Sequence, residues 1–421
     1  MNRFKPEGKA LTVGISSACG VGFMLFGYDQ GVFGGLLENE SFRMQFNYPD
    51  ATIQGQIVSS YDLGCVAGAF MALFIGDILG RRWSIYLASG FLTIGGALQA
   101  SSFTLSHMIV GRIVSGLGIG INTTTIPMWQ SETCKPEHRG KLVALQLTHL
   151  VLGFVLTNWM NFGFTYITHM QVSWRFPLAF QCALAIGTAA LLPFMVESPR
   201  WLCLKGRHSD ARQAIARLLA KPPTAAEVSE SLQIIAEVVS HEQDIQGTGW
   251  RELFAGGPQQ TFRRIALGAG VNFMQQMGGI NVIAYYLPVV LTRSFGFSNR
   301  MALMLSAFDS MQWMFWAAMA ITVIERVGRR RLLIFGAAGQ SLCFAMATIG
   351  LGIGTYAMNC VAVAFIFLYY FFFVCILQAS KFVDIPYHTD HTRGSHSWQF
   401  PSFIRQRLTP TARAMLEAPL Q

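Results

Sequence analysis

The hexapeptide Asp77-Ile78-Leu79-Gly80-Arg81-Arg82 returns later in the chain as Glu325-Arg326-Val327-Gly328-Arg329-Arg330. Each copy places an acid, two further residues, a glycine and two arginines directly after the second apolar stretch of its half of the chain. Many secondary transporters are built from such duplicated halves, with the substrate site between them near the middle of the bilayer. The repeat therefore predicts a membrane protein made of two related helical bundles.

The amino-acid composition agrees with a membrane protein. Hydrophobic residues make up 52% of the 421 residues and charged residues only 13%, about half of the roughly 25% that soluble domains carry. A chain this apolar does not stay solvated as a disordered protein. No nucleophile, base and orienting residue converge, and the eight Cys lack metal-like spacing. We therefore expect neither an enzyme nor a metal site.

Long stretches with almost no fixed charge predict about ten membrane-spanning helices, since a span needs about 20 apolar residues. The expected spans are 11–35, 57–76, 83–102, 107–130, 142–163, 175–195, 265–291, 301–324, 332–353 and 358–379. The fold class is thus all-α. We expect an N-terminal bundle of the first six spans (1–196), a linker with short amphipathic helices (197–264), an incomplete C-terminal bundle of the last four (265–379) and a polar tail (380–421).

Lys and Arg residues gather at alternate ends of the expected spans, which predicts the orientation of the chain. They occur at the beginning of the chain, at Arg81 and Arg82, in 135–141 and in 326–331, so these segments and the N-terminus are expected in the cytoplasm. The first span is too long for a cleavable signal peptide and is expected to be retained. The net charge of +9 then reflects inner loops rather than a surface for nucleic acid.

Over about residues 10–375 the chain resembles the sugar porter family of the major facilitator superfamily, and specifically its fungal hexose and proton–sugar symporter members. The resemblance rests on Phe26-Gly27-Tyr28-Asp29-Gln30-Gly31, both Gly-Arg-Arg turns, Gly111-Arg112, Ser131-Glu132, Arg139-Gly140, Glu197-Ser198-Pro199-Arg200-Trp201-Leu202, Gln275-Gln276, Gly279-Ile280-Asn281 and Tyr285-Tyr286. It implies transport of a neutral sugar, such as a hexose, by alternating access in the plasma membrane, with protons as the coupling ion and no other cofactor. Sugar and lipid are the expected partners, and the carrier is expected to be a monomer.

Asp29 is a carboxylate inside the first expected span, where an ionised group is costly and is usually functional. Arg112, in the fourth span, is an available partner, and the resemblance implies this pairing as the proton-coupling site. A carboxyl group next to a movable guanidinium can gain or lose a proton as its surroundings change. The alternative is a static buried salt bridge.

Three amides, Gln275, Gln276 and Asn281, surround the glycines 278 and 279 in the seventh span. An amide both donates and accepts hydrogen bonds, which suits the hydroxyls of a neutral sugar. Gly-rich spans also mark helices that break beside a binding site, and a break would bring these amides onto one side. The alternative is that they connect helices.

The resemblance makes these amides the sugar-binding residues and places Tyr285 at an outer gate of the sugar site. Gln146 is the candidate amide from the first half, although Leu147 occupies the position where many relatives have glutamine. Phe26 is a candidate for stacking on a sugar face, with core packing as the alternative.

Acids and arginines at the expected inner ends of the spans predict a cytoplasmic latch that holds the two halves together when the outer side is open. Its members are Asp77, Arg81, Arg82, Glu132, Arg139, Glu197, Arg200, Glu325, Arg329 and Arg330. Positive charge that only sets the orientation would explain the arginines but not the acids. Gly116 and Gly120 are expected to let their helix approach a neighbour closely.

Members of the family have twelve spans, whereas this sequence turns polar after about residue 380. The tail is unlike the family, so a truncated, inactive transporter is one alternative reading. A non-transporting sugar sensor and a facilitative carrier without proton coupling are the others.

Overall fold

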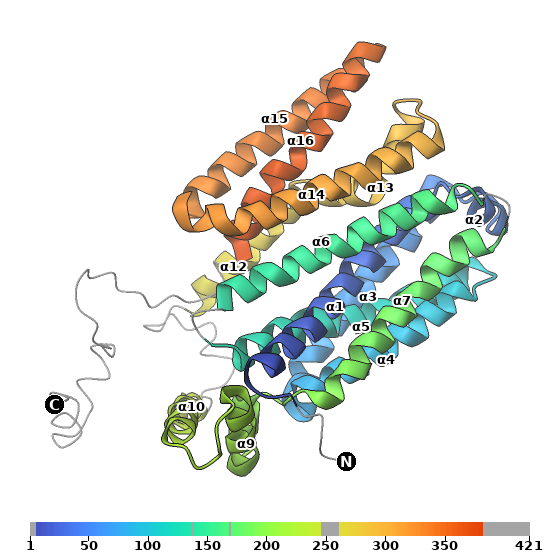
Figure 1. Cartoon of the computed structure of the whole chain (residues 1–421). Coiled ribbons are helices and arrows are strands. Elements are labelled where there is room, and N and C mark those ends of the chain that lie inside the picture. Colours follow the sequence, from blue (N-terminus) through green and yellow to red (C-terminus); the bar gives the residue numbers. More distant parts are fainter. Residues whose placement is uncertain (1–5, 136–138, 168–169, 246–260, 328, 382–421) are drawn as a thin grey trace. The chain divides into compact units, whose positions relative to one another are not determined.

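The computed structural model describes residues 6–135, 139–167, 170–245, 261–327 and 329–381. Within these residues the regular structure is helical throughout, which confirms the all-α prediction. The elements are α1 (Gly8–Leu36), α2 (Glu40–Gln45), α3 (Ala51–Leu79), α4 (Arg81–Ala100), α5 (Leu105–Thr133), α6 (Arg139–Phe164), α7 (Val172–Leu191), η2 (Leu192–Phe194), α8 (Pro199–Leu204), α9 (His208–Leu219), α10 (Ala226–Ile245), α12 (Thr261–Met277), α13 (Ile280–Arg293), α14 (Asn299–Val327), α15 (Arg329–Ile353) and α16 (Tyr356–Lys381) (Figure 1).

Every expected span coincides with a helix, and the seventh is divided between α12 and α13. By length and composition, six helices of the described residues can cross a membrane. They are 8–36, 51–79, 105–133, 172–194, 330–353 and 356–376. The larger number of spans stays a prediction.

Helices α3 and α5 pack unusually closely because glycines face each other along their contact. A Cβ atom on Gly116 would lie 2.3 Å from the backbone oxygen of Tyr61, and one on Gly120 would lie 2.2 Å from that of Cys65. On the facing helix, a Cβ on Gly64 would lie 2.4 Å from the backbone oxygen of Ile113. The expected close approach at Gly116 and Gly120 is thereby confirmed.

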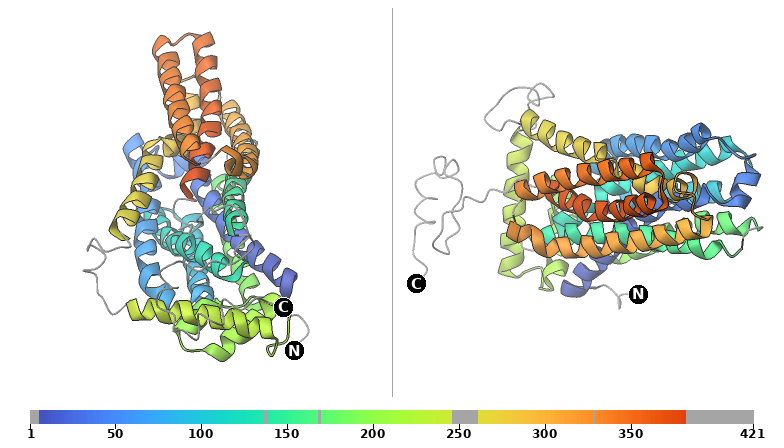
Figure 2. Two further views of the ribbon diagram at one scale, coloured as in Figure 1. Left: turned by 90° about the vertical axis from the view of Figure 1, so that its left-hand side faces the viewer. Right: turned by 90° about the horizontal axis from the view of Figure 1, so that it is seen from above.

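The linker helices α8, α9 and α10 pack against one end of the N-terminal helices, across which α10 runs (Figure 2). Trp201 of α8 lies in an apolar cluster with Leu11 of α1 and Trp129 of α5. Its indole nitrogen donates to the carbonyl of Asp77 (3.0 Å), and the indole of Trp129 donates to the carbonyl of Val196 (3.1 Å). The linker is therefore anchored to the N-terminal half.

Replacing Gly116 by alanine should destabilise the protein, because the added methyl group meets backbone atoms that cannot rotate away. Overpacking of this kind costs about 1–3 kcal/mol. We expect a lower melting temperature in detergent, measured by the loss of the monodisperse peak in size-exclusion chromatography after heating. Gly90→Ala is the matched control, since a Cβ at Gly90 meets nothing within 4 Å. An equal melting temperature for both variants would contradict the close packing of α3 on α5.

Candidate functional site

Asp29 of α1 and Arg112 of α5 form an ion pair in the interior of the N-terminal half. The Arg112 Nη1 atom lies 3.3 Å from the Asp29 Oδ1 atom, and the Arg112 and Asp29 side chains are 1% and 0% exposed. The structure therefore brings together the two residues that the sequence predicted as a pair, at a place where neither charge has access to bulk water.

Helix α3 completes the surroundings of the guanidinium group. Arg112 donates to the backbone carbonyls of Ile57 and Val58, each at 3.4 Å. Its guanidinium carbon lies 4.2 Å from the ring centre of Phe33 and 4.4 Å from that of Tyr61, so two aromatic faces stabilise the cation. The cation of the pair is thus fully surrounded by protein.

The carboxylate is less well satisfied than its partner. The Asp29 Oδ2 atom is buried and has no hydrogen-bond partner. An unsatisfied oxygen on a buried carboxylate costs free energy that a proton or a water molecule recovers. The carboxylate is thus the less completely satisfied member of the pair.

Tyr285 of α13 connects the C-terminal half to this site. It is buried in a cluster that contains Phe33 of α1 and Val58 of α3. A Cβ on Gly34 would lie 3.2 Å from the Tyr285 carbonyl oxygen, so α1 and α13 are in close contact. A movement of α13 would therefore change the packing of residues next to the Asp29–Arg112 pair.

The predicted helix break is present, and glycine is required there. Helix α12 ends at Met277 and α13 begins at Ile280. Gly279 has a φ of 80°, in the left-handed region that favours glycine, and a Cβ on it would lie 2.6 Å from the ring of Phe344. The Tyr369 hydroxyl donates to the Gly278 carbonyl at 2.8 Å. The interruption of the helix is thus confirmed and held in place from α16.

The three predicted amides lie at this break. Gln276 and Asn281 are exposed, and the Asn281 Nδ2 atom donates to the Gln276 Oε1 atom across the break at 3.3 Å. Gln275 is buried at 6% exposure. Sequence reasoning missed Gln340 of α15, whose buried Nε2 atom has no partner and whose Oε1 atom would lie 3.0 Å from a Cβ on Gly278. The sequence feature that could have identified Gln340 is an amide side chain inside an expected membrane span.

Gln146 and Phe26 lie inside the N-terminal half. The buried Gln146 side chain donates to the Oε1 atom of Gln130 on α5. The Nε2 atom of Gln130 in turn donates to the Ser16 hydroxyl of α1 at 3.2 Å. Phe26 is half-buried and packs edge-on against Phe23. The structure thus gives both side chains a packing role, and their predicted contact with sugar stays a prediction.

Several predicted latch residues meet within the N-terminal half. Arg81 pairs with Glu132 at 3.1 Å and with Asp77 at 3.4 Å. Glu197 accepts hydrogen bonds from the backbone N–H groups of Arg81 and Arg82. Burial raises the pKa of the Glu197 carboxyl, while these N–H groups act in the opposite direction. This cluster joins the ends of α3, α4 and α5 to the segment after η2.

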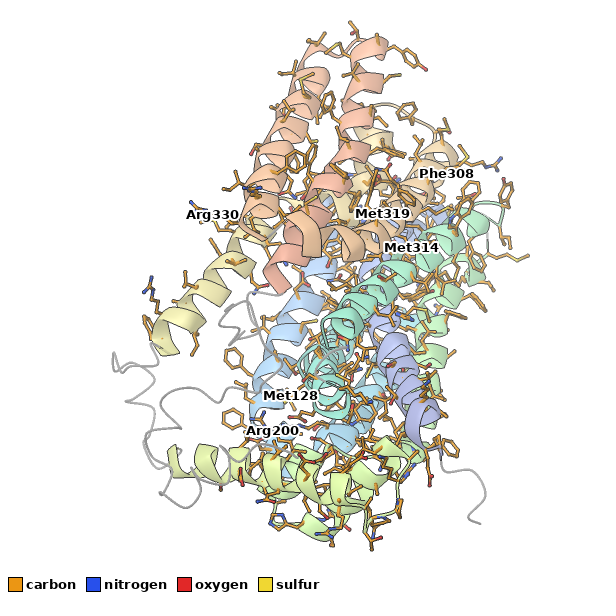
Figure 3. All side chains as sticks on the ribbon, turned by 60° about the vertical axis from the view of Figure 1, so that its left-hand side comes forward. Met128, Arg200, Phe308, Met314, Met319 and Arg330 are labelled. Atoms are coloured by element: carbon orange, nitrogen blue, oxygen red, sulfur yellow. The ribbon has the colours of Figure 1, made fainter. Side chains whose placement is uncertain are left out.

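The remaining latch residues belong to several elements. Arg200 belongs to α8 and Arg330 to α15, and Figure 3 shows these two side chains well apart. The side chains of Arg139, Glu325 and Arg329 lie outside the described part of the structure. Among the described residues, no ion pair joins the halves at this end, which we call the α9 end.

At the opposite end, which we call the α2 end, polar contacts join the two halves. Arg293, the last residue of α13, pairs with Glu38 at 3.2 Å and donates to Gln54 at 3.5 Å. Asn299, the first residue of α14, donates to the carbonyl of Glu38 at 2.9 Å. Beside these contacts is a cavity of about 430 Å³ whose lining includes Asn161 and Thr165. The two halves are thus in contact at the α2 end.

Two further acids lie inside expected spans and were missed by sequence reasoning. Asp62 of α3 has an exposed side chain and is close enough to Arg112 and Tyr286 to interact electrostatically with both. Asp309 of α14 is 1% exposed. Both carried the signal that identified Asp29, namely an acid within an otherwise apolar stretch.

Comparison with known proteins identifies relatives over most of the chain. The family described as "Sugar (and other) transporter" matches residues 15–379. The MFS-type transporter oryC of Aspergillus oryzae is 41% identical over 351 residues, which cover 82% of this chain and 65% of that protein. The sugar transporter STL1 of Saccharomyces cerevisiae is 32% identical over 350 residues, covering 80% and 61%. The chain therefore spans less than two-thirds of the length of these relatives.

A solved structure shows the same fold. The xylose transporter XylE from E. coli, in a partially occluded inward-open conformation, superposes with a TM-score of 0.74 at 22% identity and covers 89% of this chain and 86% of its own. The major facilitator fold predicted from sequence is confirmed by this match. The names of the relatives are those of transporters, in agreement with the expectation that the chain is not an enzyme.

Removing one member of the Asp29–Arg112 pair should be far more harmful than removing both. Asp29→Asn leaves a buried guanidinium without its counter-charge, which costs about 3–5 kcal/mol. We expect Asp29→Asn and Arg112→Met each to lower the melting temperature in detergent strongly, and the double variant to lower it by less than the sum of the two. Arg207→Gln is the control, since its pair with Asp210 is exposed and worth about 0–1 kcal/mol. Additive effects would mean that the two groups do not interact.

Proposed function

We propose, from the premise that this chain belongs to the sugar transporter family of the major facilitator superfamily, that it carries a neutral sugar across a membrane together with protons. A hexose is the proposed substrate class, since the amides at the α12–α13 break are uncharged hydrogen-bonding groups. The chain is a multi-pass membrane protein. The proposed location is the plasma membrane, with the N-terminus and the α9 end in the cytoplasm.

The observation that carries the proposal is the buried ion pair with one unsatisfied carboxylate oxygen. Asp29 holds Arg112 through Oδ1 while Oδ2 has no partner. Protonation of Asp29 removes its negative charge and weakens its hold on the guanidinium group. A proton taken up from the outer side would in this way change the contact between α1 and α5, beside which Tyr285 of α13 lies.

Sugar binding is proposed to use the amides around the helix break. In the present structure Gln276 and Asn281 bond to each other, so each has a partner that a sugar hydroxyl can replace without leaving a buried group unsatisfied. The interrupted backbone at Gly278 and Gly279 allows α12 and α13 to change their relative angle when the amides close on a ligand. Binding is thereby linked to a movement of α13 against α1.

The two proposed halves, 1–196 and 265–379, would move as rigid bundles around the site, with residues 197–264 as the linker. Contacts between the halves at the α2 end, together with the separation of Arg200 and Arg330, favour an inward-facing conformation. The latch charges at the α9 end would then meet in the outward-facing conformation. Closing one end while opening the other is what alternating access requires.

Uptake of radiolabelled hexose into cells lacking other hexose carriers tests the coupling role of Asp29. We expect wild-type protein to accumulate sugar when the outside is acidic, because Asp29 is loaded with a proton there. Asp29→Asn should lose accumulation against a gradient while still exchanging sugar, since the amide mimics the protonated acid. Glu40→Gln, which removes an acid at the α2 end, is the control and should behave as wild type.

The same measurement separates the alternatives. If uptake by wild-type protein did not depend on the proton gradient, the chain would be a facilitative carrier. Saturable sugar binding without any flux would indicate a sensor or an inactive transporter. An Asp29→Asn variant that remained fully pH-dependent and concentrative would remove the coupling role.

Breaking the pair between Arg293 and Glu38 should open the α2 end. Arg293→Gln removes an ionic contact between the halves, so we expect a membrane-impermeant maleimide to label a cysteine introduced at Thr165 several-fold faster. Arg43→Gln is the matched control, since Arg43 approaches the same Glu38 at 3.9 Å from within the N-terminal half. If both variants raised the labelling rate equally, the cause would be the loss of a positive charge beside Glu38 and not a separation of the halves.

A further inference from the structure

Asp309 is a carboxyl group in the middle of α14 for which the proposed transport cycle has given no role. It lies ten residues after the beginning of α14, about 15 Å along the helix and thus near the middle of a hydrocarbon core about 30 Å thick. Its side chain is 1% exposed, and its Oδ1 atom has no hydrogen-bond partner. Among the described residues, no Lys, Arg or His forms an ion pair with it.

This environment is the opposite of the one around Asp29. Asp29 has a buried guanidinium at 3.3 Å, which stabilises its charged form. Asp309 has no such partner, and an isolated carboxylate in a medium of low dielectric is so costly that the group stays neutral instead. The surroundings of Asp309 therefore favour the protonated acid.

The titratable groups near Asp309 do not provide a counter-charge. Helices α6, α13, α15 and α16 pack against α14, and from these the Tyr370 hydroxyl on α16 is the described group that interacts electrostatically with Asp309. On α6, His149 is hydrogen-bonded to the Leu145 carbonyl. On α13, Arg293 pairs with Glu38 at the α2 end. Among the described side chains, the group shown to interact with the acid is thus a neutral phenol.

A second unsatisfied polar group lies one helical turn further along α14. The indole nitrogen of Trp313 is buried and has no acceptor. The Trp313 ring stacks on Tyr370, with ring centres 4.7 Å apart. Residues four apart lie on the same face of a helix, so the orphaned donor and the orphaned carboxyl share one face. Two buried polar groups without a hydrogen-bond partner therefore lie one turn apart on this face.

Helix α14 lies along the contact with the other half of the molecule, and Trp313, one turn after Asp309, takes part in that contact. Trp313 touches Phe154 of α6 with ring centres 5.0 Å apart, and Phe308 touches Trp159 of α6 at 5.5 Å. Figure 3 shows Phe308 and Met314 along the part of α14 beside α6. Helices α6 and α14 belong to different halves, so a movement of the halves against one another changes the surroundings of residues between them.

We propose that Asp309 is a second proton-binding site, located in the C-terminal half, that holds its proton in the present conformation and releases it to water when the α6–α14 contact rearranges. The proposal rests on proton-coupled transport as the function of the chain. The proton moves between the Asp309 carboxyl and water that enters between the halves, and no other bond forms or breaks. Asp29 and Asp309 would each carry one proton in a cycle.

Infrared spectroscopy of the purified protein tests the protonation without any need for transport. We expect a band of a buried protonated carboxyl at neutral pH that disappears in Asp309→Asn and persists in Asp29→Asn. A band that is unchanged in Asp309→Asn would overturn the proposal even if sugar transport were fully proton-coupled.

Transport in proteoliposomes tests the role in coupling. We expect Asp309→Asn to lower the protons moved per sugar by about half, from about two to about one, and Asp309→Glu to keep the wild-type ratio. Gln312→Met is the matched control, because it removes a bond from α14 to the Phe367 carbonyl on α16 but no titratable group. A lower melting temperature for Asp309→Asn with an unchanged ratio would show a structural role only. Absence of proton-driven uptake by wild-type protein would instead refute the proposed function.

Discussion

The cost of an unpaired charge in hydrocarbon is the constraint on which the rest of this structure depends. Arg112 escapes that cost through a carboxylate, two backbone carbonyls and two aromatic faces. Such a pair stabilises a particular helix arrangement only as long as its charges balance, since removing one charge leaves the other buried and unpaired. A single proton therefore has a large effect on helix packing here, whereas the same proton on an exposed ion pair would change little.

Close helix packing makes this arrangement possible. The carbonyls that receive Arg112 belong to α3, and they come within reach because Gly116, one turn further along α5, lets the two backbones touch at Tyr61. A larger side chain at Gly116 would push α3 away from the guanidinium group as well as strain the contact. The position of Gly116 and the burial of Arg112 therefore depend on each other. The glycine determines how closely α3 approaches α5, and this distance allows Arg112 to form its hydrogen bonds to α3.

The sequence allowed the fold to be predicted well because membrane spans are specified locally, by runs of apolar residues that each form a helix. The break at Gly279 and the partnership of Asp29 with Arg112 were also accessible, since a backbone that only glycine tolerates and a lone acid in a span are strong signals. The direction in which the Gln146 side chain points could not be predicted. Neighbouring positions on a helix are rotated by about 100°, and Gln130 offers a competing hydrogen-bond partner. The contact of Glu38 with Arg293 could not be predicted either, because the two residues lie 255 positions apart in the sequence and no local pattern links them.

The contacts between the halves differ in kind from those within the N-terminal half. At the α2 end the halves are joined by hydrogen bonds and by one ion pair whose arginine is 43% exposed, and partly exposed pairs contribute only about 0–1 kcal/mol. Within the N-terminal half, by contrast, the glycine contacts between α3 and α5 involve backbone against backbone and have no room to slide. The proposed rearrangement would therefore take place at the boundary between the halves and not between α3 and α5. Apolar contacts also join the halves, through Tyr285 in the cluster of Phe33 and through Phe308 on Trp159, so a separation of the halves would have to break these as well as the polar contacts.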